Sequence, residues 1–145
     1  SDVWDRLYDA DIPMISVPGN HDRLGDKYSG EVHPQAETFV RDSFVKSVER
    51  TKKNIKYQEI PGPLRNSMWK VNFEGIQLAV TGEHVNKPPN DQLTRFEAVL
   101  DKSKPTVFVN HRPWDEQDPQ WNTTEWKNFV LNFPNGSMVY SGHDH

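Results

Sequence analysis

The stretch SVPGNHDRLGD, residues 16–26, begins at the end of an apolar run and passes into polar side chains after a Pro-Gly turn. The apolar run predicts a short buried strand over residues 12–17, with a proline near its start. Asn20, His21 and Asp22 follow that strand almost directly. Side chains that bind protons and metal ions are therefore expected where a buried strand ends.

The same arrangement recurs along the chain, because five of the six histidines come after predicted strands. The apolar pattern predicts these strands at residues 12–17, 76–81, 106–109 and 137–141. The histidines that follow them are His21, His84, His111, His143 and His145. If the strands run parallel, their carboxyl ends lie at one edge of the sheet, where open α/β sheets bind ligands. A crowd of imidazoles at such an edge is favourable when a divalent metal ion holds it together.

The rest of the chain predicts helices that alternate with strands. Apolar residues at helical spacing predict helices over residues 2–9 and 34–53, and two more that begin at Asp91 and at Thr123 or Thr124. Two apolar runs, residues 68–73 and 76–81, flank Glu74-Gly75 and predict a β-hairpin. The alternation, without a repeat or a linker, predicts a single α/β unit.

Composition excludes several classes of function. The chain has 145 residues, a net charge of −4 and no basic run, which gives no signal for nucleic-acid binding. No stretch approaches the ~20 apolar residues of a membrane span. The absence of cysteine excludes disulfides and thiolate zinc sites. The chain begins without Met in a helical pattern and stops among histidines, so we expect a piece of a longer protein whose localisation is unreadable.

Three short motifs, taken in order, resemble those of the calcineurin-like metallophosphoesterases. They are Gly19-Asn20-His21-Asp22, Asn110-His111-Arg112-Pro113 and Gly142-His143-Asp144-His145. The segments between the motifs are also similar to the family pattern, so that the resemblance covers nearly the whole chain. It implies a layered α/β fold with two stacked mixed sheets flanked by helices, incomplete at both ends. Residues 1–145 would be one partial phosphoesterase domain.

The resemblance implies four metal ligands. Asn20 would give its side-chain carbonyl oxygen to one ion, which His111 and His143 would also bind. His145 would bind a second ion. Imidazole and oxygen ligands suit manganese, iron or zinc, and the sequence does not choose among them.

The resemblance also implies two catalytic residues that bind no metal. His21 would face the phosphate, stabilise its charge and protonate the leaving oxygen. Asp22 would hold the other ring nitrogen of His21, and a carboxylate beside an imidazole favours its charged form.

The family pattern begins with an Asp-x-His motif and a Gly-Asp motif, and neither occurs at the expected place. Gly25-Asp26 has the right letters, but it follows the asparagine motif and lies in a predicted loop. We expect the two motifs to precede Ser1 in a longer protein. The 145-residue chain alone is then expected to bind metal weakly and to be inactive.

The function implied is hydrolysis of a phosphate ester through a two-metal site with a metal-activated hydroxide. The substrate would be a phosphate-ester small molecule or a phosphorylated macromolecule. Two alternatives stay open: an inactive binding or scaffold module that keeps the fold, and a mononuclear metal hydrolase that uses His111, His143 and His145.

Overall fold

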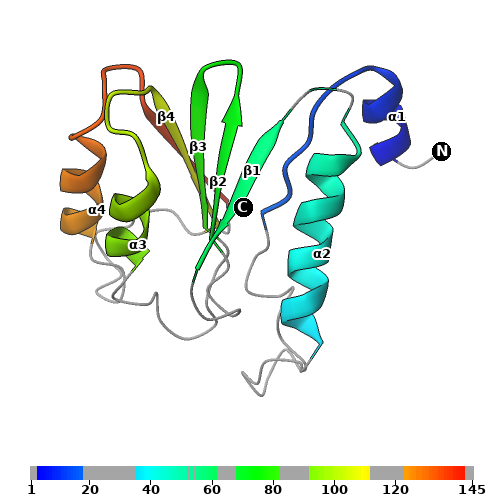
Figure 1. Ribbon diagram of the computed structural model, residues 1–145, viewed down its shortest axis with the longest axis horizontal. Helices are drawn as coiled ribbons and strands as arrows, with labels where there is room; N and C mark the ends of the chain where they lie inside the picture. Colours follow the sequence, from blue (N-terminus) through cyan, green and yellow to red (C-terminus); the bar gives the residue numbers. More distant parts are fainter. Residues whose placement is uncertain are drawn as a thin grey trace.

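The computed structural model describes residues 3–17, 35–51, 53, 55–61, 68–81, 92–111 and 123–142, which form four helices and five strands (Figure 1). In chain order the elements are α1 (Val3–Asp9), α2 (Ala36–Glu49), β1 (Lys56–Ile60), β2 (Met68–Phe73), β3 (Ile76–Thr81), α3 (Gln92–Val99), β4 (Thr106–Asn110), α4 (Thr123–Val130) and β5 (Met138–Ser141). No helix in these ranges is long and apolar enough to cross a membrane.

The strands form one mixed sheet in the order β1-β2-β3-β4-β5. β1, β2 and β3 pair antiparallel, whereas β3, β4 and β5 pair parallel. The α/β class is confirmed, and so is the parallel direction of β4 and β5, which precede His111 and His143. The described ranges contain this single sheet. The second sheet of the expected stacked pair is not among the described residues.

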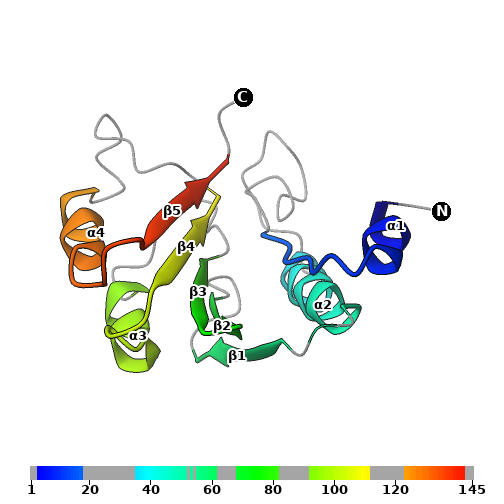
Figure 2. The same ribbon diagram turned by 90° about the horizontal axis from the view of Figure 1, so that it is seen from above.

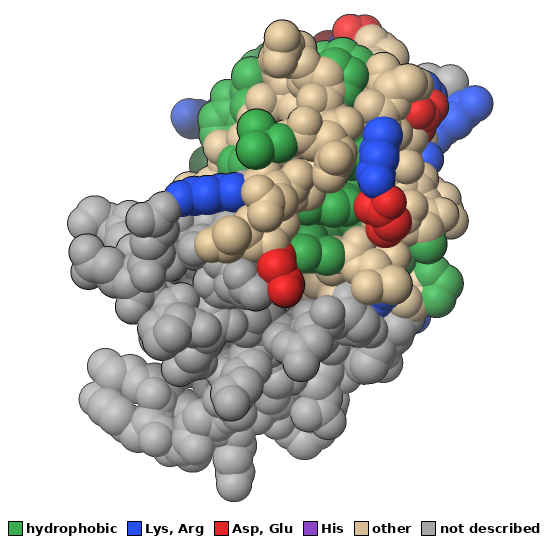
Figure 3. Space-filling model, turned by 90° about the vertical axis from the view of Figure 1, so that its left-hand side faces the viewer, with side chains coloured by type: hydrophobic (Ala, Val, Ile, Leu, Met, Phe, Trp, Pro, Cys, Tyr) green, Lys and Arg blue, Asp and Glu red, His purple; other side chains and the backbone are tan. Residues whose placement is uncertain are grey.

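Helices cover both faces of the sheet (Figures 1 and 2). α3 and α4 pack on one face, where a first hydrophobic cluster includes Phe96, Phe108 and Phe129. α2 packs on the other face, where a second cluster includes Phe44 and Trp69. The rings of Phe44 and Trp69 stack with centroids 4.1 Å apart. Seen from the side of α4, the described surface shows scattered charged side chains of both signs among hydrophobic and uncharged atoms (Figure 3).

The predicted hairpin is confirmed with its strand bounds. Phe73 pairs with Ile76 across the turn, and Glu74 and Gly75 have φ angles of +50° and +81°. Hairpin turns with two residues at positive φ match the right-handed twist of the strands, and glycine adopts this conformation without strain.

The predicted helices are confirmed, although α2 is shorter than the 34–53 pattern suggests. β1 was not predicted. It is half polar, and its residues alternate between exposed and partly buried, as expected for an edge strand.

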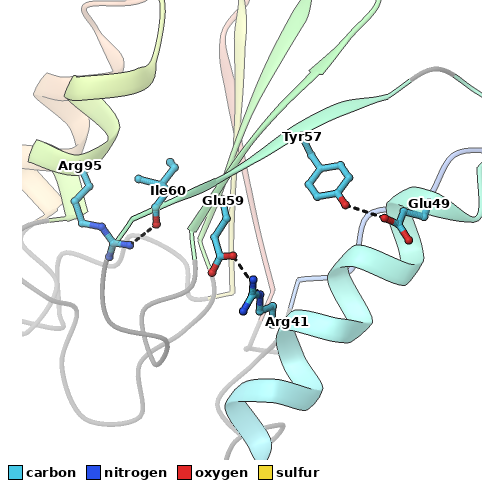
Figure 4. Close-up of polar contacts among 6 residues, drawn as sticks. All are labelled: Arg41, Glu49, Tyr57, Glu59, Ile60 and Arg95. Carbon is cyan, nitrogen blue, oxygen red and sulfur yellow. Dashed lines mark hydrogen bonds and ion pairs between the residues drawn. The ribbon is translucent and has the colours of Figure 1, made fainter.

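Polar contacts hold β1 between two helices (Figure 4). On the side of α2, the Tyr57 hydroxyl donates to Glu49 at 2.9 Å and Arg41 pairs with Glu59 at 3.2 Å. The carboxylate of Glu49 raises the pKa of the Tyr57 phenol, chiefly through that hydrogen bond. On the side of α3, Arg95 donates to the carbonyl oxygen of Ile60 at 2.9 Å.

The prediction of a strand over residues 12–17 is wrong, because these residues belong to neither a helix nor a strand. The backbone amide of Ile12 donates to Leu7, and that of Ser16 donates to the hydroxyl of Ser47 on α2. Ile15 and Val17 pack on the second hydrophobic cluster. Apolar residues thus bury this segment as expected, but a strand also needs a neighbouring strand for its hydrogen bonds, and this segment pairs with none in the described ranges.

A buried glutamine fixes the turn between α3 and β4. The Gln77 side chain is fully buried; its amide nitrogen donates to the Asp101 carbonyl and to the Thr106 hydroxyl, at 3.2 and 2.9 Å. Its amide oxygen accepts from the Asp101 backbone at 2.9 Å. These bonds fix where β4 begins relative to β3, and thereby where β4 ends.

The same turn predicts a pH effect. The exposed Asp101 carboxylate accepts from the hydroxyl and the backbone amide of Ser103, at 2.6 and 2.9 Å, which lowers its pKa below the ordinary 3.8. A lowered pKa means that stabilisation by this carboxylate is present above pH 3.8 and disappears as pH falls through the lowered value. We expect Asp101→Asn to be less stable than the parent at pH 7, and the gap to close below about pH 4. Urea unfolding of both proteins across pH measures it, and a pH-independent gap would contradict the assignment.

Candidate active site

The candidate site lies where β4 and β5 end. Asn110, the last residue of β4, pairs with Ser141, the last residue of β5. Just beyond the strands, the backbone amide of Gly142 donates to the carbonyl oxygen of His111 at 2.8 Å. The second and third motifs therefore leave the sheet side by side.

Gly142 also lies close to the ring of His111. A Cβ atom at position 142 would be 3.7 Å from the carbonyl oxygen of His111 and 3.9 Å from its Nδ1 atom. These are ordinary van der Waals distances, so position 142 lies directly beside the imidazole of His111. His111 itself is half-buried.

A hollow of about 230 Å³ opens at this edge of the sheet. The described residues that line it are Val17, Val109, Asn110, His111, Tyr140, Ser141 and Gly142. None of them is an acid, a lysine or an arginine, so the only titratable side chains of this lining are an imidazole and a phenol. A hollow of this size has room for a phosphate group with part of its ester.

Val17 brings a third segment to the hollow. It ends the extended stretch 12–17, which Ser47 of α2 holds by a hydrogen bond to the backbone amide of Ser16, at 3.2 Å. Ile15 and Val17 pack against the second cluster, which also contacts Val109 of β4. Although residues 12–17 do not form a strand, they reach the same edge as the parallel strands.

One of the six predicted site residues, His111, lies in the described part of the chain. Asn20, His21, Asp22, His143 and His145 lie outside the described residues, so that their roles stay predictions. Within the described ranges, no three His, Cys, Asp or Glu side chains gather closely enough to hold a metal ion.

The structure adds residues to the site that sequence reasoning did not assign to it. Asn110 is buried, with 8% of its surface exposed, and directly precedes His111. Tyr140 is 59% exposed and lies two residues before Gly142. An exposed aromatic residue in a strand that leads into a histidine motif is the signal that marks Tyr140.

A second hollow, of about 180 Å³, lies on α2 and is lined by Ser43, Lys46, Ser47 and Arg50. None of its described lining residues is a predicted site residue. Arg50 is neutralised there by Asp5 of α1, at 2.5 Å. The hollow at the ends of β4 and β5 is thus the candidate active site.

Comparison with known proteins agrees with the motifs. The sequence profile of the family described as calcineurin-like phosphoesterase matches residues 1–145. No curated protein and no solved structure matched the chain. The resemblance carried by the three motifs is therefore confirmed over the whole length of the sequence. The chain belongs to the calcineurin-like phosphoesterase family.

Proposed function

We propose that this chain contributes most of a two-metal site for phosphate-ester hydrolysis. Its family is one of metal-dependent phosphoester hydrolases, which supports the reaction class. The observation that carries the proposal is the contact between His111 and Gly142. His143 is the next residue, and consecutive Cα atoms are about 3.8 Å apart, so the second and third motifs converge on one place.

The first motif is within reach of the same place. Val17 lines the hollow, and Asn20 is three positions further along the chain, a span of at most about 11 Å. In the proposal Asn20, His111 and His143 hold one ion, and His145 holds the other. Imidazole nitrogens and an amide oxygen, without sulfur, fit manganese, iron or zinc. The described donor, His111, fits this set because its half-buried imidazole lines the hollow.

Two ions bound together supply Lewis acidity to the phosphate and a water that is acidic enough to deprotonate near neutral pH. The side chains of this protein supply the proton transfer and hold the substrate. His21 stabilises charge on the phosphate and gives a proton to the leaving oxygen. Asp22 orients the imidazole of His21 through its second nitrogen. Asn110 and Tyr140 form the floor and wall of the hollow that receives the ester.

We propose that residues which precede Ser1 in a longer protein also contribute to the site. The Asp-x-His and Gly-Asp motifs of the family would lie there, on strands of a second sheet stacked against the one described. The substrate would be a phosphate-ester small molecule or a phosphorylated macromolecule.

The first test is metal binding by the 145-residue chain. We expect the parent chain to bind Mn²⁺ weakly. His111→Ala or His143→Ala should lower the Mn²⁺ affinity further, by at least the 10–100-fold that the loss of a residue supporting a metal ligand costs. His33→Ala is the matched control, because His33 belongs to none of the three motifs. Isothermal titration calorimetry measures all four proteins. Equal effects of His33→Ala and His111→Ala would contradict the ligand assignment.

The second test is turnover of an aryl phosphate. We expect none from the 145-residue chain and metal-dependent hydrolysis from a longer protein that includes the two preceding motifs. Two ions per chain with turnover would support the proposal. One ion with turnover would favour a mononuclear hydrolase, and bound metal without turnover would favour an inactive binding module.

A further inference from the structure

The buried side chain of Ser47 joins α2 to residues 12–17, the segment beside α2 that leads to the first motif (Figure 1). Ser47 is 2% exposed, and its hydroxyl donates to the carbonyl oxygen of Phe44, one turn earlier in α2, at 2.7 Å. A serine hydroxyl carries one proton, so this bond leaves its oxygen to act only as an acceptor. That oxygen accepts from the backbone amide of Ser16 at 3.2 Å. The helix thus fixes the orientation of a hydroxyl that binds one particular amide of the segment.

This hydrogen bond fixes something that the apolar packing of the same segment does not. Ile15 and Val17 pack on the second hydrophobic cluster, but apolar contacts are non-directional and set no single register along a helix. A hydrogen bond sets the register, because donor and acceptor must meet at a defined distance and angle. Serine is disfavoured in a helix interior, where its hydroxyl competes for backbone hydrogen bonds. The contact with Ser16 explains why a serine stands at this buried position of α2.

The register of this segment decides where the first motif reaches the candidate active site. Val17 directly follows Ser16 and lines the hollow together with His111 and Gly142. Asn20 is three positions beyond Val17. A slip of the segment by one residue would move the chain by about 3.3–3.6 Å, which is more than the length of a bond between a metal ion and its ligand. A site that uses Asn20 therefore needs the segment held in one register.

Two ion pairs also connect this part of the chain to α2 and the residues after it. Arg50 pairs with Asp5, and Lys53 pairs with Asp11. All four of these side chains are at least 40% exposed, and exposed ion pairs contribute little because water and salt screen them. Both acids also lie further from the first motif in the chain than Ser16 does. The buried contact of Ser47 is thus the one that holds the end of the segment nearest the hollow.

We propose that Ser47 is a positioning residue of the active site. By accepting from the Ser16 amide it sets where the first motif meets the hollow at the ends of β4 and β5. It touches neither metal ion nor substrate and acts through the chain that connects Ser16 to Asn20. This role rests on the proposed function, in which Asn20 binds a metal ion.

The first experiment measures hydrogen exchange of the Ser16 backbone amide by NMR in the metal-free 145-residue chain. Ser47→Ala removes the acceptor and should speed this exchange by at least about tenfold, because the amide loses the hydrogen bond that protects it. Ser47→Thr keeps the hydroxyl and should restore the parent rate. Ser47 borders the hollow of about 180 Å³ on α2, which has room for the added methyl group. Lys53→Ala is the matched control, because it breaks an exposed contact with the same segment and should leave the rate unchanged.

The second experiment measures the Mn²⁺ affinity of the same variants by isothermal titration calorimetry. Ser47→Ala should lower the affinity by about tenfold, the lower end of the 10–100-fold that the loss of a residue supporting a metal ligand costs. Ser47→Thr and Lys53→Ala should bind Mn²⁺ as the parent chain does. Circular dichroism checks that every variant is folded, and urea unfolding measures its stability. A serine with a merely structural role would change the unfolding midpoint and leave the affinity of the folded chain unchanged.

His111→Ala separates a failure of this inference from a failure of the proposed function. If His111→Ala weakens Mn²⁺ binding while folded Ser47→Ala binds like the parent, Ser47 has no positioning role and the proposed function stands. If His111→Ala leaves Mn²⁺ binding unchanged, the proposed function itself is wrong. Unchanged exchange of the Ser16 amide in Ser47→Ala, or equal effects of Lys53→Ala and Ser47→Ala, would overturn the positioning role directly.

Discussion

Replacing His21 by alanine is expected to lower phosphate-ester turnover by about 10²–10⁴-fold while metal content stays nearly unchanged. This range is typical for the loss of a positioned acid or base. In the proposal His21 faces the substrate and protonates the leaving oxygen, whereas the ions are held by other residues. Its loss should therefore reduce catalysis without emptying the site.

Asn20→Ala is the matched comparison, because Asn20 is the neighbour of His21 in the chain. Neighbouring side chains at a turn point in different directions, so one can bind metal while the other faces the substrate. We expect Asn20→Ala to lower metal content and to raise the metal concentration needed for activity. The measurement is metal stoichiometry together with kcat, in the longer protein that turns over an aryl phosphate. If His21→Ala loses a metal ion and Asn20→Ala does not, the two roles are reversed.

Replacing Trp69 by alanine is expected to lower the free energy of unfolding by about 3–5 kcal/mol, the usual cost of truncating a buried tryptophan or phenylalanine. Trp69 is fully buried in β2, and its ring stacks on Phe44 of α2 with an interplanar angle of 14°. The loss would leave a cavity between the sheet and α2. A marginally stable domain loses a large part of its stability by such a change.

Urea unfolding measures this effect, and Val3→Ala provides the control. Val3 is 65% exposed on α1, so that its truncation should change stability by less than about 0.5 kcal/mol. Trp69→Ala should also loosen residues 12–17, because α2 holds them through Ser47 and the second cluster. Faster amide exchange at Ile15 and Val17 would show it. A Trp69→Ala protein as stable as Val3→Ala would contradict the packing described.

The sequence by itself determined the elements that depend on local pattern. The hairpin follows from Glu74-Gly75, which adopts the positive φ angles that its turn requires. α3 and α4 follow from apolar residues at helical spacing that bury Phe96, Trp126 and Phe129. The three motifs identified the family, because each histidine motif is a short run of residues whose order along the chain is visible without coordinates.

Only the tertiary structure decided what depends on partners distant in the chain. β1 is a strand because β2 pairs with it and α2 and α3 hold it, and its own sequence of alternating polar residues is ambiguous. Residues 12–17 have the apolar pattern of a strand, yet in the described ranges they have no strand to pair with. The hollow exists because Val17, His111 and Gly142, separated by up to 125 positions of chain (142 minus 17), meet at one edge. A periodicity reports which face of a segment is buried, but hydrogen-bond pairing and the convergence of loops are set by which segments become neighbours.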